Sequence, residues 1–476
     1  MMIKTSLRPA AVFGICLSLL SPALAQDNKN APTSRPPVED RRFHSDAVEA
    51  FIEKVKANIS DPEVARTFEN TFPNTLDTTV FYTEENGVPD TYIITGDIDA
   101  MWLRDSSAQV NHYIPLAKED EKLAKMINGL IRRQTRYILK DPYANAFYRE
   151  PDKVGEWATD HTEMQPGVHE RKWELDSLSY PIRLAYRYWK ATGDESAFDN
   201  EWLKAMNLAV DTMKEQQRKN GKGPYSFMRT TQWATDTVPG NGFGNPVKPT
   251  GMICSTFRNS DDAAIYLFNI PENLMAVASL RHLSEMLNSM GKDPALAKEA
   301  AELADEVEAA VKEHGIVEHP KYGKIYAYEV DGFGNALFMD DAGLPSLVSI
   351  PYLGYGSIDD PVYQNTRKFA LSEDNPYFFK GKAAEGTGSP HLARAGDSMI
   401  WPMGISSRAL TSNDPAEIAR CIDMLVKNTG GTGFMHEGFD KDDGSNYTRP
   451  WFAWSNSLFA EMIVDTYENH PEVLKK

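Results

Sequence analysis

The chain repeats apolar residues mainly with the spacing of amphipathic helices. In eight segments they recur at positions i, i+3, i+4 and i+7, which places them on one face of an α-helix. The predicted helices span residues 121–139, 178–190, 202–217, 263–290, 294–312, 398–410, 416–427 and 458–467. Strand-like alternation is scarce, so the pattern favours one large all-α domain over residues 43–476.

Short segments rich in Asp, Arg and Trp precede some of these helices. The six segments start roughly 50 to 85 residues apart and span 101–110, 171–184, 256–268, 338–350, 394–405 and 444–459. Taken singly, their Asp and Ser residues could be ordinary helix N-caps. The Trp and Arg residues beside most of them favour a shared site instead. Six helical hairpins with such inner helices predict a closed (α/α)6 toroid, whose inner N-termini meet around a funnel.

The first 42 residues are not expected to belong to this domain. Lys4 and Arg8 precede an apolar run at 10–20, and Ala23-Leu24-Ala25 ends it with small residues. This run is too short to cross a bilayer of about 30 Å, so residues 1–25 are predicted to be a signal peptide of an exported protein, periplasmic or secreted. The polar, proline-rich residues 26–42 predict a disordered lead-in.

Composition restricts the partners of the protein more than its activity. The formal net charge is −18, which disfavours nucleic acid and anionic membranes and suits a neutral substrate. No later stretch has the apolar length of a membrane span. The nine Trp and twenty Tyr suit sugar binding, although aromatic residues are also ordinary core material. Cys254 and Cys421 are expected to be buried free thiols, and the oligomeric state is not predicted.

Four long segments resemble the signature blocks of glycoside hydrolase family 125. They read GDIDAMWLRDSSAQV, HERKWELDSLSYP, FRNSDDAAIYLFNIPENL and MHEGFDKDDGSNYTRPWFAWSNSLFAE. The resemblance covers residues 70–465, approximately, and implies an exo-acting α-mannosidase, chiefly for α-1,6 linkages, that inverts the anomeric centre without metal or cofactor. Its substrate would be a mannose-containing oligosaccharide or an N-glycan. One departure is Asn259, where the family usually has Pro; because proline at a helix start mainly sets φ, little functional loss is expected.

Inverting hydrolysis requires two carboxyl groups about 6.5 to 9.5 Å apart, one to protonate the leaving oxygen and one to activate water. The resemblance assigns the acid to the pair Asp261–Asp262 and the base to Glu437. On a helix, adjacent residues point about 100° apart, so only one of the pair can face the funnel, and Asp262 is preferred. Two helix-end carboxylates remain the alternative for the pair. Glu437 follows a glycine-rich loop beside His436, where a solvated glutamate is the alternative.

Three clusters of aromatic, basic and acidic residues are predicted to bind the terminal mannose. Arg–carboxylate pairs that merely fix helix ends are the alternative for Arg104 and Arg449. The predicted substrate-binding residues are Trp102, Arg104, Asp105, Trp173, Glu174, Asp176, Arg258, His436, Tyr447, Arg449 and Trp451.

No metal site is predicted. The ten His show neither HxH nor HExxH spacing. A calcium loop at 440–444 fails because Gly444 is one position early and Trp451 stands where the bidentate Glu belongs, so an acidic turn is expected. P-loop, dinucleotide and GxSxG motifs are absent from the sequence.

Two rival functions remain open. The first is another glycosidase, or a polysaccharide lyase, on the same toroid; a lyase requires a basic cleft, which the acidic balance disfavours. The second is an exported glycan-binding protein without catalysis, which would need the aromatic residues but not Glu437 or the Asp pair.

Overall fold

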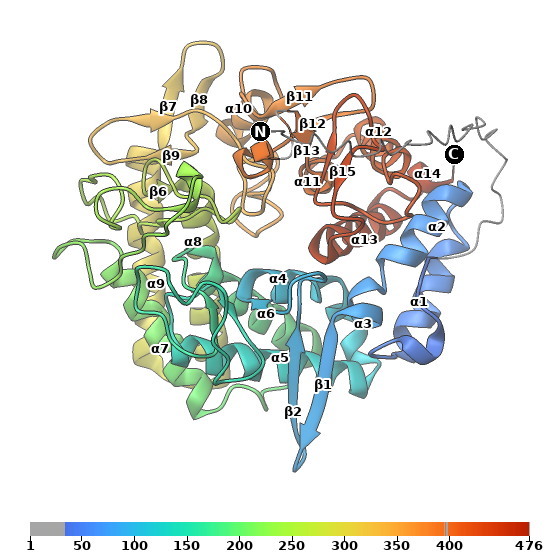
Figure 1. The fold of residues 1–476 in the computed structure, drawn as a ribbon, viewed down its shortest axis with the longest axis horizontal. Helices are drawn as coiled ribbons and strands as arrows, with labels where there is room; N and C mark the ends of the chain where they lie inside the picture. The colour runs from blue at the N-terminus through green and yellow to red at the C-terminus, as the bar shows by residue number, and fades with distance from the viewer. Residues whose placement is uncertain (1–33, 395, 397, 476) are drawn as a thin grey trace, which may run out of the picture. The chain divides into compact units, whose positions relative to one another are not determined.

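The computed structural model describes residues 34–394, 396 and 398–475, in which helices dominate (Figure 1). The longer helices lie where the apolar spacing predicted helices, and several start at an acidic cap; Asp120, for example, accepts from Leu123 N before α5. The helices are α1 (Asp46–Lys56), α2 (Pro62–Thr71), α3 (Asn74–Thr78), α4 (Leu103–Ala108), α5 (Glu121–Lys140), α6 (Asp176–Thr192), α7 (Asn200–Glu215), α8 (Ile270–Met290), α9 (Pro294–Ala310), α10 (Pro361–Ala370), α11 (Pro402–Leu410), α12 (Pro415–Lys427), α13 (Ala453–Asn469) and α14 (Pro471–Leu474).

These helices pack as two connected sets. In the first set, neighbours contact one another in the order α8, α6, α4, α13, α11. Helices of the second set pack on those of the first: α9 on α8, α5 on α6, α12 on α11 and α2 on α13. Every helix of the first set begins within or directly after one of the Asp-, Arg- and Trp-rich segments, so the predicted site residues gather at the starts of these helices.

Small antiparallel sheets hold the starts of the first-set helices. The strands β3 (Met101–Trp102), β6 (Phe268–Asn269) and β13 (Met399–Ile400) lead into α4, α8 and α11 respectively, and each pairs within its own three-stranded sheet. The other members of these sheets are β4 (Ala146–Phe147), β5 (Val168–Glu170), β9 (Glu329–Val330), β10 (Ala336–Leu337), β14 (Gly438–Asp440) and β15 (Tyr447–Thr448).

Three two-stranded hairpins complete the sheet structure of the described residues. They are β1 (Val80–Glu85) with β2 (Val88–Ile93), β7 (Ile316–His319) with β8 (Gly323–Tyr326), and β11 (Phe378–Lys380) with β12 (Glu385–Thr387). The all-α expectation therefore held for the helices and missed the sheets, whose strands are mostly too short to show a period of two.

Three predicted helix starts were wrong, and one segment leads into no helix. Helix α13 begins at Ala453 rather than 458. Helix α8 begins at Ile270 rather than 263, because 263–267 forms an isolated bridge and then bends before β6. Helix α11 begins at Pro402 rather than 398, after β13. The segment at 338–350 runs into turns, and α10 starts only at Pro361.

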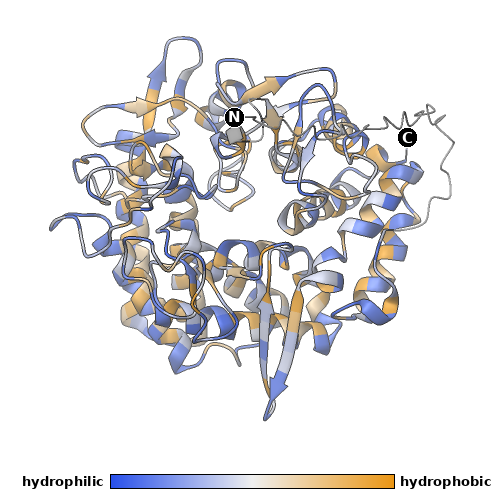
Figure 2. Cartoon of the chain, viewed as in Figure 1, coloured by the Kyte–Doolittle hydropathy of each residue, from blue (hydrophilic) through white to orange (hydrophobic). Residues whose placement is uncertain are grey.

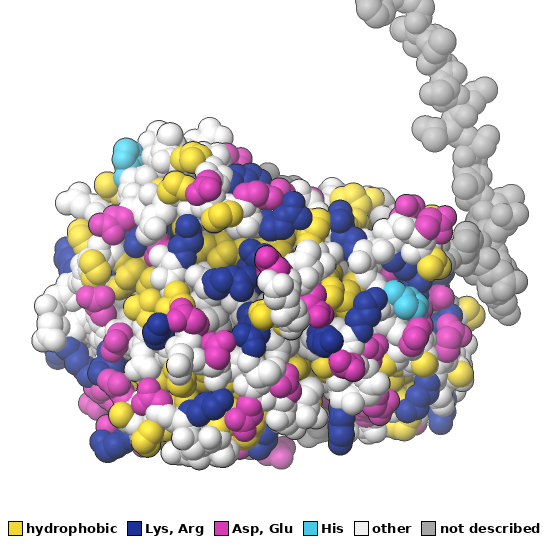
Figure 3. All heavy atoms as spheres, turned by 90° about the horizontal axis from the view of Figure 1, so that it is seen from below, with side chains coloured by type: hydrophobic (Ala, Val, Ile, Leu, Met, Phe, Trp, Pro, Cys, Tyr) yellow, Lys and Arg dark blue, Asp and Glu magenta, His cyan; other side chains and the backbone are white. Residues whose placement is uncertain are grey.

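An apolar cluster fills the space between the first-set helices. It includes Tyr180 of α6, Met275 of α8, Met403 of α11 and Trp454 of α13, with Leu344 from the turns of the fourth segment. The longer helices α8 and α13 are buried on most sides, as expected for helices enclosed by other elements. Figure 2 shows apolar stripes along the helices, and Figure 3 shows acidic and basic side chains interspersed on one face.

The prediction of a disordered lead-in at 26–42 was wrong for residues 34–42. Arg35 is 4% exposed at its side chain and donates to Asp77 at 2.8 Å and to Glu49 at 2.6 Å. A buried arginine paired with two carboxylates fixes this stretch on α1 and α3. The predicted signal peptide and residues 26–33 lie outside the described residues. No helix in the described part combines the length and apolar character needed to span a bilayer, and Cys254 and Cys421 are buried free thiols.

Candidate active site

A cavity of about 50 Å³ lies where the first-set helices begin. Six of the predicted site residues line it: Trp102, Arg104, Asp105, Asp261, Glu437 and Arg449. The remaining lining residues are Thr95, Ile98, Asn259, Ser260, His391, Trp401, Phe452 and Trp454. Segments more than 300 residues apart in the chain thus meet at one place, as the toroid prediction required.

Arg104 pairs with several acidic groups at this cavity. Its side chain is 3% exposed, and its Nη1 lies 2.6 Å from Glu174 Oε2 and 3.4 Å from Asp176 Oδ2. Its Nη2 donates to Asp261 Oδ1 at 3.2 Å, and its Nε lies 3.4 Å from Asp105 Oδ2. One buried guanidinium therefore faces four carboxyl groups.

These four carboxyl groups contact one guanidinium, and their pKa values shift in different directions. Burial raises the pKa of Glu174 well above its usual range, and it raises the pKa values of Asp105 and Asp176 to about 6. Asp261 differs: burial acts to raise its pKa, but the charges of Arg104 and Lys172 outweigh burial and lower it. A hydrogen bond between Glu174 and Asp261 contributes to both shifts, in opposite directions, so a proton on Glu174 would be held next to an ionised Asp261.

Asp261 and Asp262 lie on a turn, not on the helix that was predicted. Arg258 N donates to Asp262 O at 2.8 Å and Asp261 N donates to Arg258 O at 2.9 Å, which closes the turn. Asp261 adopts a left-handed φ of 65° and lines the cavity. Asp262 is 1% exposed and does not line the cavity; its Oδ1 lies 3.3 Å from His391 Nδ1. As expected, only one of the two faces the cavity, and the placement favours Asp261 over Asp262.

Glu437 sits at the end of the glycine-rich loop, directly before β14, as predicted. Gly430, Gly431 and Gly433 all have positive φ values, which permit the tight path of this loop. The Glu437 side chain accepts from Thr448 Oγ1 at 3.3 Å and lies 3.4 Å from Arg449 Nη1. Its carboxylate is thus positioned by two side chains at the wall of the cavity.

Trp173 and Trp451, predicted to bind sugar, do not line the cavity. Trp173 is 1% exposed, and its indole N–H donates to Cys254 O at 2.7 Å, so it supports the segment leading to the turn at 258–262. Trp451 packs against Gly96, where a Cβ would lie 2.7 Å from its ring. Glu174 and Asp176 do not line the cavity either, but both contact Arg104, which does.

Three other predicted residues also do not line the cavity: Arg258, His436 and Tyr447. Arg258 Nε donates to Glu329 Oε1 at 2.6 Å, and both side chains are almost fully buried. The rings of His436 and Tyr447 stack at 3.8 Å, and His436 Nδ1 bonds to Arg449 O at 2.8 Å. These contacts shape the two loops that carry the lining residues, and a direct sugar contact by the three residues stays a prediction.

The sequence interpretation missed His391, Trp401 and Lys172. His391 lines the cavity three residues before the fifth segment; the histidines had been searched only for metal spacing. Trp102 and Trp401 line the cavity, and their indole nitrogens are buried without a hydrogen-bond partner among the described residues. Lys172 Nζ donates to Asp261 O at 2.9 Å. A Lys within the RKWELD segment was the available signal.

The acidic stretch at 440–444 forms a turn of its own. Asp440 Oδ1 accepts from the backbone N–H groups of Asp442 and Asp443 at 2.8 and 3.2 Å. Over the described ranges, no group of three or more His, Cys, Asp or Glu residues could hold a metal ion.

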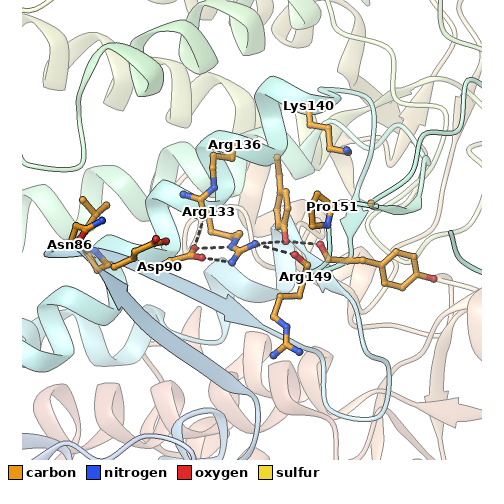
Figure 4. Close-up of a pocket in the computed structure, with 13 residues that line it drawn as sticks. Asn86, Asp90, Arg133, Arg136, Lys140, Arg149 and Pro151 are labelled. Carbon is orange, nitrogen blue, oxygen red and sulfur yellow. Dashed lines mark hydrogen bonds and ion pairs between the residues drawn. The ribbon is translucent and has the colours of Figure 1, made fainter. Parts of the chain in front are cut away.

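A larger cavity of about 590 Å³ lies elsewhere, between the β1–β2 hairpin and α5 (Figure 4). Asp90 at its wall is held by Arg133, whose Nε donates at 2.8 Å, and by Arg136. The other lining carboxylate is the exposed Glu85. Because no second positioned carboxyl group opposes Asp90, the chemistry of glycoside hydrolysis fits the smaller cavity, despite the difference in volume.

Known proteins are similar to this one over nearly the whole chain. A sequence model described as "Metal-independent alpha-mannosidase (GH125)" matches residues 61–464. The meiotically up-regulated gene 157 protein of Schizosaccharomyces pombe is 45% identical over 465 residues, covering 94% of this chain and 90% of that protein. A Streptococcus pneumoniae protein from a family of metal-independent α-mannosidases, in a non-productive complex with α-1,6-mannobiose, is 42% identical with a TM-score of 0.86. The match covers 90% of this chain and 99% of that one.

A bacterial glucoamylase in complex with acarbose has the same fold at low identity. Its TM-score is 0.53 at 13% identity, over 89% of this chain and 59% of that one. The family match and the S. pombe and S. pneumoniae relatives agree with the signature blocks, so the chain belongs to glycoside hydrolase family 125, the α-mannosidase family, and is a glycoside hydrolase.

Proposed function

We propose that this protein is an exo-acting α-mannosidase that removes terminal α-1,6-linked mannose with inversion and without a metal ion. In this proposal Asp261 is the general acid and Glu437 is the general base. One observation carries the assignment: these two carboxylates, from loops 176 positions apart in the sequence, line the same small cavity. The α-1,6-mannobiose bound to the S. pneumoniae relative supports the linkage.

The buried groups on one side of the cavity favour attack at the end of a glycan. Arg104 lines the cavity, and its partners Glu174 and Asp176 are fully buried behind it, so we infer that a glycan chain does not pass through on this side. The unpartnered indole N–H groups of Trp102 and Trp401 are donors in the wall that sugar hydroxyl groups can satisfy. A terminal mannose entering end-on would meet all of these groups at once.

The proton of the Glu174–Asp261 pair supplies the acid step. Glu174 is fully buried, and its raised pKa keeps a proton at neutral pH beside Asp261. In our scheme the proton passes from Glu174 to Asp261, and Asp261 then gives it to the leaving oxygen, so that both carboxyl groups end ionised. Glu437, held by Thr448 and Arg449, takes a proton from the water that attacks the anomeric carbon.

We also infer that the two helix sets close as an (α/α)6 barrel. Five positions of the inner ring are the first-set helices, and the turns following 338–350 take the sixth position next to α10. The contacts of Leu344 with the central apolar cluster support this reading.

Release of mannose from α-1,6-mannobiose by the purified protein tests the proposed function. The same assay separates it from the rivals, because a non-catalytic glycan-binding protein would bind the disaccharide without cleaving it. A protein that cleaves a glucoside or a uronate but not a mannoside would contradict the assigned specificity. Export, which residues 1–25 predict, is a separate proposal tested by cell fractionation and by sequencing the mature N-terminus.

A further inference from the structure

We propose that His391 is a further substrate-contacting residue of this site, and that Asp262 is a positioning residue that acts through His391. On this reading Asp262 orients an imidazolium toward the sugar and does not itself protonate the glycosidic oxygen. The inference deepens the proposed function and rests on it for the identity of the bound sugar.

The geometry places His391 between the buried turn and the open cavity. It lies in the short 3-10 helix Pro390–Arg394 and lines the cavity together with Asp261 and Glu437. Its Nδ1 lies 3.3 Å from Asp262 Oδ1. Its ring is nearly perpendicular to the ring of Trp401, with the two centroids 6.2 Å apart. No described residue bonds its Nε2, and its side chain is 27% exposed. One ring nitrogen is therefore fixed by the protein, and the other remains for a ligand.

Asp262 has the position of a supporting group. Its side chain is 2% exposed, and its Oδ2 is buried without a hydrogen-bond partner among the described residues. A buried carboxylate of this kind needs a nearby positive charge, and the imidazolium of His391 is the one in contact with it. Because Asp262 does not line the cavity, we infer that it acts on the substrate through His391.

The charges around the cavity keep His391 protonated. Burial alone would lower its pKa, but the bond to Asp262 and the charges of Asp262, Glu437 and Asp261 raise it to about 9. An imidazolium has two N–H donors, so Nε2 would donate to a sugar hydroxyl. The charged groups that line the cavity with His391 are Asp105, Asp261, Glu437, Arg104 and Arg449, and Asp262 contacts its ring from outside the cavity.

Titration of the histidine ring by NMR tests the pair without relying on turnover. The His391 resonance, identified by its loss in His391→Gln, should titrate near pH 9 in the wild type. Asp262→Asn should lower that midpoint by at least about one pH unit, because the charged partner of the ring is lost. His282→Gln is the matched control, since His282 stacks on Tyr186 of α6, away from the cavity. A His391 midpoint that does not move in Asp262→Asn would overturn the proposed coupling.

Kinetics then separate a positioning role for Asp262 from a catalytic one. On α-1,6-mannobiose, His391→Gln should raise KM about tenfold or more and abolish the basic limb of the kcat/KM profile. Asp262→Asn should move that limb to lower pH while keeping kcat at its optimum within about tenfold of wild type, and Asp262→Glu should restore the limb. Unfolding temperatures within a few degrees of wild type would show that both variants fold.

Two kinetic outcomes would also overturn the inference. If Asp262→Asn lost about 10³-fold in kcat at every pH and recovered on an aryl mannoside with a good leaving group, Asp262 would be the general acid. If His391→Gln left both KM and the pH profile unchanged, His391 would not contact the substrate. A wild-type protein that cleaves no mannoside would instead contradict the proposed function, while the NMR titration would still report on the pair.

Discussion

Arg449 holds Glu437 at the wall of the cavity, with its Nη1 3.4 Å from Glu437 Oε1. Arg449 itself has a left-handed φ of 54°, and its Nε lies 3.3 Å from Asp97 Oδ2. A non-glycine residue in this region costs about 1 kcal/mol or more, and such residues cluster at functional sites. The arginine therefore fixes the position of the proposed base and completes the wall with Glu437.

Replacing Glu437 by Gln should remove the base and leave the shape of the site. We expect kcat on α-1,6-mannobiose to fall by about 10²- to 10⁴-fold, because a positioned general base contributes about that much. KM should change little. Azide, a nucleophile that needs no deprotonation, should partly restore turnover of an activated aryl mannoside. A variant retaining about a tenth of wild-type kcat would place the base elsewhere.

Glu174→Gln should reduce turnover most where the leaving group needs a proton. The variant lacks the buried carboxyl group whose proton is held next to Asp261. We expect a loss of about 10²-fold or more on α-1,6-mannobiose and a much smaller loss on an aryl mannoside whose leaving group has a low pKa. Asp261→Asn should show the same contrast more strongly. Equal losses on both substrates would mean that neither residue takes part in proton delivery.

Arg104→Ala should destabilise the fold as well as the site. Glu174, Asp176 and Asp261 would lose their shared guanidinium, and breaking a buried pair costs about 3–5 kcal/mol. Urea unfolding measures this loss. Arg281→Ala is the control, because Arg281 is half-exposed and pairs with Asp305 and Glu308 at the surface; its loss should be below about 1 kcal/mol.

The Arg104→Ala variant should also recover stability at lower pH. Burial already raises the pKa values of Glu174 and Asp176 in the folded protein, and removing the guanidinium raises them further. A folded state that binds more protons than the unfolded state gains stability as pH falls. The stability difference from wild type should therefore be smaller at about pH 5 than at about pH 8. A difference that grows toward pH 5 would contradict the assigned protonation.

Activity on α-1,6-mannobiose should survive treatment with EDTA. In the scheme above the carboxylates, histidine and tryptophans of the cavity perform every step, so chelation should leave kcat/KM within about twofold of its untreated value. Activity that is lost with EDTA and restored by calcium or zinc would overturn the metal-independent assignment. The test applies to the wild-type protein, after dialysis against chelator-treated buffer.

The sequence predicted the long helices and the meeting of the motif segments. Their signals are local: the apolar spacing of α5, α9 and α12 is visible within each segment, and caps such as Asp120 mark the starts. The short strands before α4 and α8 could not be predicted, since two residues show no periodicity. Their pairing depends on partners far along the chain.

Part of the site was predictable because its residues lie in local sequence motifs. Trp102, Arg104, Asp105 and Glu437 lie in motif segments, and all line the cavity. The division between Asp261 and Asp262 was not predictable, because it depends on the left-handed turn at Asp261 rather than on a helix. His391 was missed because its partner Asp262 lies 129 positions away, and a single sequence does not report such a contact.

The anomer released first is the most direct test of the central claim that Asp261 and Glu437 work as an inverting pair. If water held by Glu437 attacks the anomeric carbon, an α-mannoside must release β-mannose before mutarotation mixes the anomers. Proton NMR during the first minutes of hydrolysis of α-1,6-mannobiose, with enough enzyme to outrun mutarotation, distinguishes the two products. We predict β-mannose as the initial product. Initial α-mannose would indicate double displacement through a covalent mannosyl-enzyme, with carboxylates only about 5 Å apart, and would contradict the assignment.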